Sequence, residues 1–338
     1  MGRVTLNDVS ARAGVSRATA SLVVRGSGRI SAATSARVRE AMEELGYVYD
    51  RRAAGLRGTR SMTLGVVVTE IRNPFVSELV MALESDLHDG GYTVLVGHSH
   101  DEAAREAELL ATMVERHVDG ILLHPAQDSD PASVDRYTAR SGTPLVLVMR
   151  HFGDDHHYVG PDNVAAGRTL GVHLRDIGVR SVQMVGGPAN SSARRERLEG
   201  LRQGLGKGIE LDPGERTATP TNYSDVGERA MAQVFDHGRL ADAVVGFSDV
   251  VTMGMYSEMY RRGLVPGKDV AVASFDDIVM AGWLNPPLTS VATRPIAVGG
   301  EAAALLMEQI ATPGPAQVRL LEPELRLRAS TLSWRPRR

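Results

Sequence analysis

The chain has 338 residues, of which 43% are hydrophobic and 23% charged, a composition typical of globular proteins rather than of disordered or fibrous ones. It contains no cysteine, which excludes disulfides and thiolate chemistry and agrees with a reducing compartment. No apolar run is long enough for a membrane helix, and the N-terminus lacks the apolar core of a signal peptide, so we expect a cytoplasmic protein with no membrane partner.

Charge is distributed unevenly along the chain. Residues 1–60 carry 11 basic against 5 acidic side chains, the remainder carries 27 against 36, and the formal net charge is −3. A basic module joined to an acidic body indicates a nucleic-acid-binding head, because phosphate contacts supply most non-specific affinity. A basic tail on an unrelated domain is the alternative, but such tails seldom have apolar helical periodicity.

The stretch from Thr5 to Val24 predicts two short helices separated by Gly14. Thr5 and Asp8 have the spacing of a capping box, and Ser16 can cap the second helix. Helical spacing assigns a buried face to Leu6, Val9, Ala13, Ala20, Val23 and Val24. This pattern predicts a helix-turn-helix whose second helix enters the DNA major groove, with an ordinary helical hairpin as the alternative.

A third helix is predicted from Ser31 to Leu45, with Gly46 as its stop. It closes a three-helix core and completes a small all-α domain over residues 1–49. Residues 50–60 are rich in arginine and small side chains, so we expect a linker with weak helical potential.

From Met62 onward, apolar runs of strand length alternate with amphipathic helical segments. The runs are LGVVV, YTVLVG, VDGILLH, PLVLVM, SVQMVGG, AVVGFSD and VAVASFDD. Continuous apolar strands between helices predict parallel sheets that are covered on both faces. Since the alternation occurs in two successive sets, we predict an α/β body of two doubly wound subdomains, with a ligand site in the cleft beyond the carboxyl ends of their strands.

Several motifs occur together in the order and spacing of one family. They are VTLNDVSARAGVSRATASLVV near the N-terminus, then NPF (73–75), VDGILL (118–123), GPDNVAAGR (160–168), RLEG (197–200), FSD (247–249), SFDD (274–277) and PPLTSV (286–291). Through them the chain resembles the LacI/GalR family of bacterial transcription repressors over nearly its whole length.

The resemblance implies a domain plan. It places a helix-turn-helix domain at 1–49, a hinge at 50–60 and an effector-binding and dimerisation domain at 61–338, with a fold like that of periplasmic sugar-binding proteins. The N-subdomain would combine 61–161 with 293–322, and the C-subdomain 162–292 with 323–338. Family members bind near-palindromic operators as dimers or tetramers. Because STLSWRPRR carries no appended leucine heptad, we expect a homodimer on double-stranded operator DNA.

The resemblance also assigns DNA contacts, to Thr5, Ser16, Arg17, Ala18, Thr19, Ser21, Leu22, Arg25, Ala53 and Leu56. Arg17 would read a guanine bidentately. Leu22 stands where the family usually has arginine, so we expect an operator that differs from the usual half-site at that position. Leu56 resembles the hinge leucine that wedges between base pairs. A linker leucine packed on its own domain is the alternative for Leu56.

Effector contacts carried over by motif position are Glu70, Phe75, His100, Arg150, Arg197, Tyr223, Ser248, Asp249 and Asp276. Arginine and aspartate can pair with vicinal hydroxyls while an aromatic ring supplies a flat apolar face, so these side chains suit a polyhydroxylated ligand. Arg197 and Asp276 are the leading candidates, and an interdomain salt bridge is the alternative for both. Met149, His98 and His100 depart from the family pattern and leave the ligand open.

Other patterns point to no further chemistry. Asp154, Asp155, His156 and His157 are consecutive, and a solvated loop is favoured over a metal site. The sequence has neither a dinucleotide-binding glycine pattern nor a nucleophile elbow, so we expect no cofactor and no enzyme. We therefore predict a ligand-responsive repressor with a sugar or sugar derivative as effector. A purine- or nucleoside-dependent corepressed regulator and a soluble sugar-binding protein are the alternatives.

Overall fold

The computed structural model describes residues 4–24, 26, 28–48, 60–218, 224–237 and 240–336. The chain forms two compact units, Met1–Ser61 and Met62–Arg338, which we term the head and the body. Four residues that the sequence assigns to function lie outside the described residues: Arg25, Ala53, Leu56 and Tyr223.

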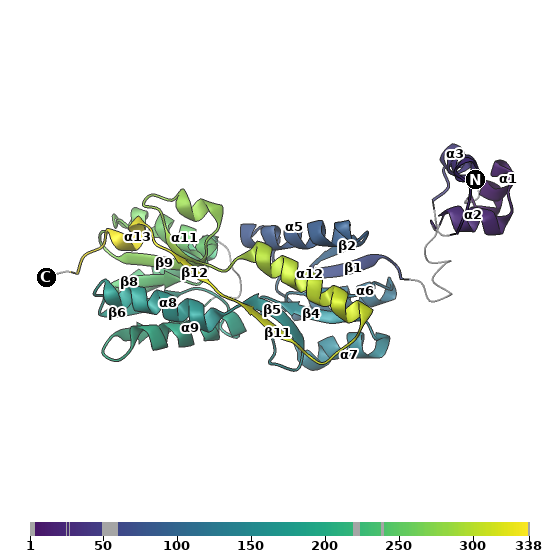
Figure 1. Ribbon diagram of the computed structural model, residues 1–338. Helices are drawn as coiled ribbons and strands as arrows, with labels where there is room; N and C mark the ends of the chain where they lie inside the picture. Colours follow the sequence, from purple (N-terminus) through teal and green to yellow (C-terminus); the bar gives the residue numbers. More distant parts are fainter. Residues whose placement is uncertain are drawn as a thin grey trace. The chain divides into compact units, whose positions relative to one another are not determined.

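The described part of the head consists of the helices α1 (Leu6–Ala13), α2 (Arg17–Val24) and α3 (Ala32–Leu45) (Figure 1). The predicted capping box is confirmed: the Thr5 amide donates to Asp8 Oδ2 at 2.8 Å, and the Asp8 amide donates to Thr5 Oγ1 at 3.4 Å. Gly14 and Gly46 have φ values of 64° and 63°, and they end α1 and α3 in the left-handed conformation that glycine adopts without strain.

A small apolar core holds the three helices together. It consists of Val9, Ala13, Ala20, Val38 and Ala41. Arg37 of α3 adds a polar link, since its Nη2 donates to the carbonyl of Ala13 at 2.8 Å and to that of Gly14 at 3.3 Å. These carbonyls lie at the end of α1, where backbone acceptors lack intrahelical partners and a cation is favourable. Packing and capping together set the orientation of α2 within the head.

The first sheet of the body consists of β1 (Thr63–Val68), β2 (Thr93–His98), β3 (Ile121–Leu123), β4 (Leu145–Val148), β5 (His157–Pro161) and β11 (Val318–Leu321). Its order is β11-β5-β4-β3-β1-β2, and all neighbouring strands are parallel. The helices that belong to it are α5 (Pro74–Asp89), α6 (Ala103–Glu115), α7 (Pro131–Ser141) and α12 (Pro295–Ala311). This sheet with its helices is the first subdomain.

The second sheet consists of β6 (Ser181–Val185), β7 (Glu210–Asp212), β8 (Ala243–Gly246), β9 (Ala271–Asp276), β10 (Thr289–Ala292) and β12 (Glu324–Arg326). Its order is β12-β10-β9-β8-β6-β7, with only the β10–β12 pair antiparallel. The second subdomain also contains α8 (Asn163–Asp176), α9 (Ser192–Leu205), η1 (Glu215–Thr217), α10 (Ser224–His237), α11 (Asp249–Arg261), η2 (Val279–Gly282) and α13 (Ala329–Leu332).

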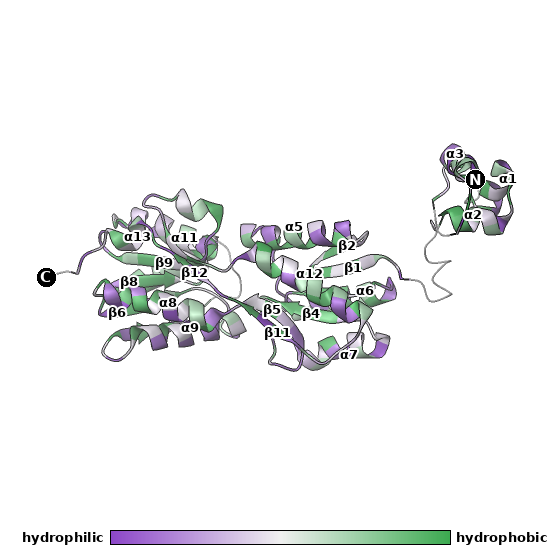
Figure 2. Cartoon of the chain, in the orientation of Figure 1, coloured by the Kyte–Doolittle hydropathy of each residue, from purple (hydrophilic) through white to green (hydrophobic). Residues whose placement is uncertain are grey.

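Both faces of each sheet are covered, as the continuous apolar runs predict. On β1, Val66 and Val68 pack with α5 and α12, while Val67 between them packs with α6. Figure 2 shows hydrophobic residues concentrated along the strands and hydrophilic ones on the outer sides of the helices. The predicted fold class, a helical head with two parallel-sheet α/β subdomains, is confirmed.

The chain passes between the two sheets three times: after β5, after β10 and between β11 and β12. These passages place the carboxyl ends of strands from both sheets near one another. None of the helices in the described ranges is long and apolar enough to cross a membrane.

Glycines bring α8 and α9 into backbone contact in the second subdomain. A Cβ atom added at Gly167 would lie 2.2 Å from the carbonyl oxygen of Arg197, and one added at Gly200 would lie 2.1 Å from that of Val164. Both distances are far below van der Waals contact, so only glycine fits at these positions. The close approach fixes α9, which carries Arg197, against the start of α8.

Candidate DNA-binding surface and effector cavity

The helix α2 carries five of the residues that the sequence assigns to DNA: Arg17, Ala18, Thr19, Ser21 and Leu22. Ser16 caps this helix, because its Oγ accepts from the Thr19 amide at 3.0 Å and lies 2.9 Å from Thr19 Oγ1. Arg17 and Ala18 are exposed at its first turn, whereas Ala20 is buried in the core. The side chain of Arg17 therefore projects from a helix end that packing and capping hold in place.

Ser21 and Leu22 lie further along α2 and are partly buried. Both δ methyl groups of Leu22 lie 3.5 Å from the position of a Cβ added at Gly28, so the leucine packs along the loop that follows α2. Thr5 is exposed but is already engaged with Asp8 in the capping box. Position 22 carries leucine, so Arg17 is the one arginine of α2.

A cavity in the body collects side chains from both subdomains. Its lining is Thr69, Glu70, Asn73, Phe75, Val76, His100, Asp101, His124, Met149, Arg150, Ala193, Arg197, Phe247 and Asp276. These residues follow the carboxyl ends of strands or begin helices, the position at which doubly wound proteins bind ligands. Six of the predicted effector residues line this cavity: Glu70, Phe75, His100, Arg150, Arg197 and Asp276.

Arg150, from the first subdomain, is paired with Asp101. Its Nη1 donates to Asp101 Oδ1 at 2.6 Å, and its Nη2 donates to Oδ2 at 3.2 Å, a bidentate geometry in which both side chains are 9% exposed. Nη1 also donates to the carbonyl of Pro125 at 3.0 Å. Asp101 additionally accepts from the Gln127 amide at 2.9 Å. The positive charge of Arg150 is therefore matched within the protein.

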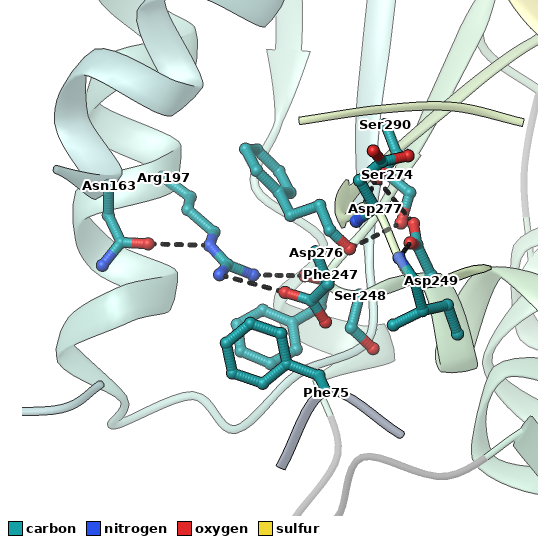
Figure 3. Close-up of polar contacts among 12 residues, drawn as sticks. Phe75, Asn163, Arg197, Phe247, Ser248, Asp249, Ser274, Asp276, Asp277 and Ser290 are labelled. Carbon is teal, nitrogen blue, oxygen red and sulfur yellow. Dashed lines mark hydrogen bonds and ion pairs between the residues drawn. The ribbon is translucent and has the colours of Figure 1, made fainter. Parts of the chain in front are cut away.

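Arg197, from the second subdomain, is held mainly by neutral groups (Figure 3). Its Nε donates to Asn163 Oδ1 at 3.0 Å and its Nη1 to the Phe247 carbonyl at 2.6 Å, whereas the contact from Nη2 to Asp276 Oδ1 is 3.5 Å. The guanidinium carbon lies 4.6 Å from the centre of the Phe275 ring and 5.0 Å from that of Phe247, which are cation–π distances.

The salt-bridge alternative for Arg197 and Asp276 holds for the pairing, but its placement between the subdomains is wrong. The two residues contact each other, but α9 and β9 belong to the same subdomain. Burial raises the pKa of Asp276, and the nearby charge of Arg197 opposes that rise. Asp276 also has a φ of 109°, a strained backbone at the end of β9 that turns its side chain toward the cavity.

Glu70 carries the clearest unused polar atom of the cavity. Its Oε1 accepts from the Arg72 amide at 2.7 Å, but its Oε2 is buried without a hydrogen-bond partner. Burying such an atom unpaired costs about 1 to 3 kcal/mol. Phe75 lies nearby, at the start of α5, which Asn73 caps by accepting from the Phe75 amide at 3.1 Å. Glu70 and Phe75 thus offer a ligand one acceptor and one apolar ring.

Two predicted effector residues do not line the cavity. Ser248 caps α11, with its Oγ accepting from the Val251 amide at 3.3 Å. Asp249 accepts from the Ile278 amide at 2.8 Å and from Ser290 Oγ at 2.7 Å, and it is fully buried (Figure 3). Burial, and after it the neighbouring Asp276 carboxyl, raise the pKa of Asp249. Both side chains hold the second subdomain together behind the cavity wall.

Several lining residues were missed by the sequence reading. The most consequential is Asp101, which follows the carboxyl end of β2 and could have been found by asking which polar residues end each strand. Asn73, Thr69 and Phe247 end strands or begin helices in the same way. His124 also lines the cavity, and burial lowers its pKa well below the ordinary value, so it is neutral there.

The consecutive Asp154 to His157 do not converge. His156 Nε2 lies 2.9 Å from Asp135 Oδ1, whereas His157 belongs to β5 and its Nδ1 accepts from the Gln317 amide at 3.2 Å. Among the described residues, no group of three or more His, Asp and Glu side chains is arranged to hold a metal ion.

Comparisons with known families match both units of the chain. A model described as bacterial regulatory proteins of the lacI family matches residues 5–50. A model for a periplasmic binding protein-like domain matches residues 172–331. The first covers α1 to α3, and the second covers most of the second subdomain and the return through α12.

Curated relatives match over almost the whole chain. The ribose operon repressor of Escherichia coli K12 is 30% identical over 331 residues, covering 96% of this chain and 99% of the repressor. The HTH-type transcriptional regulator CelR of Thermobifida fusca is 34% identical over 340 residues, covering 97% of this chain and 98% of CelR. The HTH-type transcriptional repressor CytR of Escherichia coli K12 is 29% identical, covering 97% of this chain and 96% of CytR.

Solved structures share the same fold. A CelR–cellobiose complex is 31% identical, with a TM-score of 0.72 over 97% of this chain and all of that one. The Lac repressor dimer bound to operator and the anti-inducer ONPF is 23% identical, with a TM-score of 0.85 over 98% of this chain and 99% of that one. With curated relatives of 30% identity or more that span both units, the chain belongs to the LacI family of bacterial transcription regulators.

Proposed function

We propose that the protein is an effector-responsive transcription repressor that binds a near-palindromic, double-stranded operator as a homodimer. The observation that carries this proposal is the combination of a capped α2 with Arg17 exposed and a separate cavity that gathers side chains from two subdomains. A solved relative is a Lac repressor dimer bound to operator, which supports the dimeric arrangement. Two-fold symmetry in the protein would match the palindrome in the DNA.

The effector is a small polyhydroxylated molecule without a strong negative charge. Arg150 is already neutralised by Asp101, and Arg197 is enclosed by Asn163, the Phe247 carbonyl and Asp276. A phosphate group would find no unpaired cation among the lining residues that the structure describes, and it would face Glu70. Hydroxyl groups, by contrast, can donate to the unused Oε2 of Glu70.

Relatives favour the same class of ligand. One solved relative holds cellobiose, another LacI-family regulator holds ribose, and a curated relative is named a ribose operon repressor. The alternative, a nucleoside, keeps one argument in its favour, because Phe75 and Phe247 can stack on a flat base. Effector binding would change the arrangement of the subdomains and thereby DNA affinity, a coupling that typically amounts to about 1 to 3 kcal/mol.

DNA binding is tested by selecting duplexes from a random pool with the full chain at low and at moderate salt. Salt suppresses phosphate attraction, so a near-palindrome that survives moderate salt reports base readout. Arg17→Ala should relax selection at one position of each half-site and cost about 1 to 3 kcal/mol. Arg39→Ala, at an exposed site on α3, is the matched control and should leave the selected sequence unchanged.

Two further variants test individual assignments in the same selection. Leu56→Ala should weaken specific binding more than non-specific binding, since a wedge acts only on a bent, specific site. Equal losses would favour a leucine packed on its own domain. Recovery of the family's usual half-site would contradict the prediction that Leu22 changes the preferred base at that position. If no sequence is enriched at either salt concentration, the repressor proposal fails.

Effector class is tested by isothermal titration with D-ribose, cellobiose, cytidine and D-ribose 5-phosphate. We expect binding of a neutral sugar and none of the phosphate ester. Glu70→Gln should weaken sugar binding, because the amide replaces one acceptor oxygen by a donor. Binding of ribose 5-phosphate in preference to ribose would refute the proposed effector class, and preference for cytidine would establish the alternative.

A further inference from the structure

A hydrogen-bonded contact joins the two subdomains outside the cavity. His151 follows β4 in the first subdomain, and its Nε2 lies 2.6 Å from Oε1 of Glu196 on α9 in the second. The His151 amide also donates to Oγ of Ser192, at the start of α9, at 3.2 Å. Neither His151 nor Glu196 lines the effector cavity. The contact therefore joins the two subdomains without lining the ligand cavity.

The hydrogen bonds around His151 indicate which ring nitrogen carries the proton. The Gly153 amide donates to Nδ1 at 3.1 Å, so Nδ1 is an acceptor and the ring proton lies on Nε2, pointing at Glu196. The imidazole also packs on the ring of Tyr158, with centroids 4.7 Å apart. Backbone and ring contacts of the first subdomain thus hold the imidazole in the orientation that meets Glu196.

Glu196 connects His151 to Asn163, because its carboxylate accepts a hydrogen bond from each of them. Its second oxygen, Oε2, accepts from Asn163 Nδ2 at 3.1 Å. Because that amide nitrogen is committed to Glu196, the amide oxygen of Asn163 must face the other way, where it accepts from Nε of Arg197 at 3.0 Å. Asn163 is 2% exposed, so no bulk water substitutes for either partner. Figure 3 shows Asn163 directed at the guanidinium of Arg197.

We propose that His151 is a positioning residue that, through Glu196 and Asn163, orients the guanidinium of Arg197 toward the effector cavity. The relay makes the orientation of this arginine depend on contact between the subdomains. Two donors, His151 Nε2 and Asn163 Nδ2, meet at the Glu196 carboxylate, so loss of the His151 bond frees that carboxylate to rotate away from Asn163 and weakens the two bonds that follow. The biological role of the relay rests on the proposed effector role of Arg197, but its test uses no effector.

The first test follows the Nε–H group of Arg197 by nuclear magnetic resonance in the full chain. Arg197→Lys identifies the signal by removing it. In His151→Ala we expect its proton to exchange with water about tenfold faster, the equivalent of about 1.4 kcal/mol. His151→Gln should stay near wild type, because its amide nitrogen can donate from the place of Nε2. Unchanged exchange in His151→Ala would overturn the proposal.

His156→Ala is the matched control. His156 forms the same kind of contact with Asp135, at 2.9 Å, but both residues lie in the first subdomain. It should leave the Arg197 signal at its wild-type exchange rate. If His156→Ala accelerates exchange as much as His151→Ala does, the effect is general loosening and the relay is refuted. Should His151→Ala fail to fold, Glu196→Gln interrupts the relay with a side chain of equal size, because its single oxygen can accept from His151 or from Asn163 but not from both.

The second test titrates the imidazole of His151. The hydrogen bond to Glu196 raises the pKa of His151, burial opposes that rise, and the charges facing the ring are those of Glu196, Asp154 and Arg195. Protonation of the ring strengthens the bond to Glu196 but places a proton on Nδ1, so it breaks the bond that Nδ1 accepts from the Gly153 amide. Glu196→Gln should lower the pKa of His151. The same pKa in both proteins would contradict the relay.

Discussion

The two subdomains each place one arginine in the cavity, and they hold it in opposite ways. Arg150 of the first subdomain is bound bidentately by Asp101, so a carboxylate matches its charge before any ligand arrives. Arg197 of the second is held by an amide oxygen, a backbone carbonyl and two aromatic rings, and its nearest carboxylate contact is 3.5 Å long. The first arginine is thus paired within the wall of the cavity, whereas the second has no carboxylate in close contact.

The two subdomains also differ in how closely their helices pack. In the second, α8 and α9 meet through Gly167, Gly171, Gly200 and Gly204, where added Cβ atoms would approach backbone atoms at 2.1 to 2.7 Å. In the first, α5 and α12 pack largely through apolar side chains such as Leu79 and Val298. Backbone contact leaves less freedom for adjustment than side-chain contact does. The second subdomain therefore holds Arg197 on the more rigid support.

The largest expected effect comes from removing the charge that matches Arg150. Asp101→Asn leaves that guanidinium buried without a carboxylate, which should destabilise the body by about 3 kcal/mol or more. The thermal unfolding midpoint of the full chain measures the loss. The same variant should gain affinity for D-ribose 5-phosphate, since the freed arginine can then bind an anion. An unchanged midpoint would show that Asp101 and Arg150 are not an effective ion pair.

Helix packing provides the next largest effect. Gly200→Ala places a methyl group 2.1 Å from the Val164 carbonyl oxygen, so the helices must separate at a cost of about 3 kcal/mol. Gly299→Ala on α12 is the counterpart in the first subdomain, where the closest atom is the Cβ of Ala82 at 2.9 Å, and it should cost about 1 kcal/mol. Thermal unfolding measures both. Equal losses of stability in the two variants would show that the α8–α9 and α5–α12 pairs are equally rigid.

A smaller effect is expected from Asn163→Ala. The substitution leaves Nε of Arg197 and Oε2 of Glu196 without their shared partner and should cost about 1 to 2 kcal/mol. Asn190→Ala is a control, because Asn190 donates to Asp128 at 3.1 Å in an exposed contact and its loss should be close to neutral. If Asn163→Ala is equally neutral, the support of Arg197 does not run through this amide.

The smallest effect is a dependence of stability on pH that belongs to the second subdomain. Burial raises the pKa values of Asp249 and Asp276 above the ordinary 3.8, so between about pH 4 and the raised pKa values the folded body binds more protons than the unfolded chain. Stability should therefore fall as pH rises through the raised pKa values, by at most about 1.4 kcal/mol per pH unit for each proton. Asp249→Asn should flatten this part of the curve of unfolding midpoint against pH. A curve of unchanged slope would contradict the assignment.

Local patterns in the sequence determined the secondary structure and the fold class. The capping box of Thr5 and Asp8, the cap at Ser16 and the stops at Gly14 and Gly46 were readable because each depends on residues only a few positions apart. The apolar runs predicted covered parallel strands for the same reason, since a buried strand must be apolar on both of its faces. The family resemblance implied Arg197 and Asp276 by motif position, and both line the cavity.

Only the tertiary structure determines which side chains from distant segments of the chain pair with each other. Asp101 lies 49 positions before Arg150, so its place after β2 marks it as a candidate lining residue but does not reveal its pairing with Arg150. Asp249 was expected at the ligand but is bonded to Ser290 and the Ile278 amide, because the folding of β10 and the segment after β9 brings those donors to it. His151 and Glu196 meet for a similar reason, across two subdomains. Sequence periodicity reports which residues are buried, whereas the pairing of buried charges depends on the packing of complete sheets.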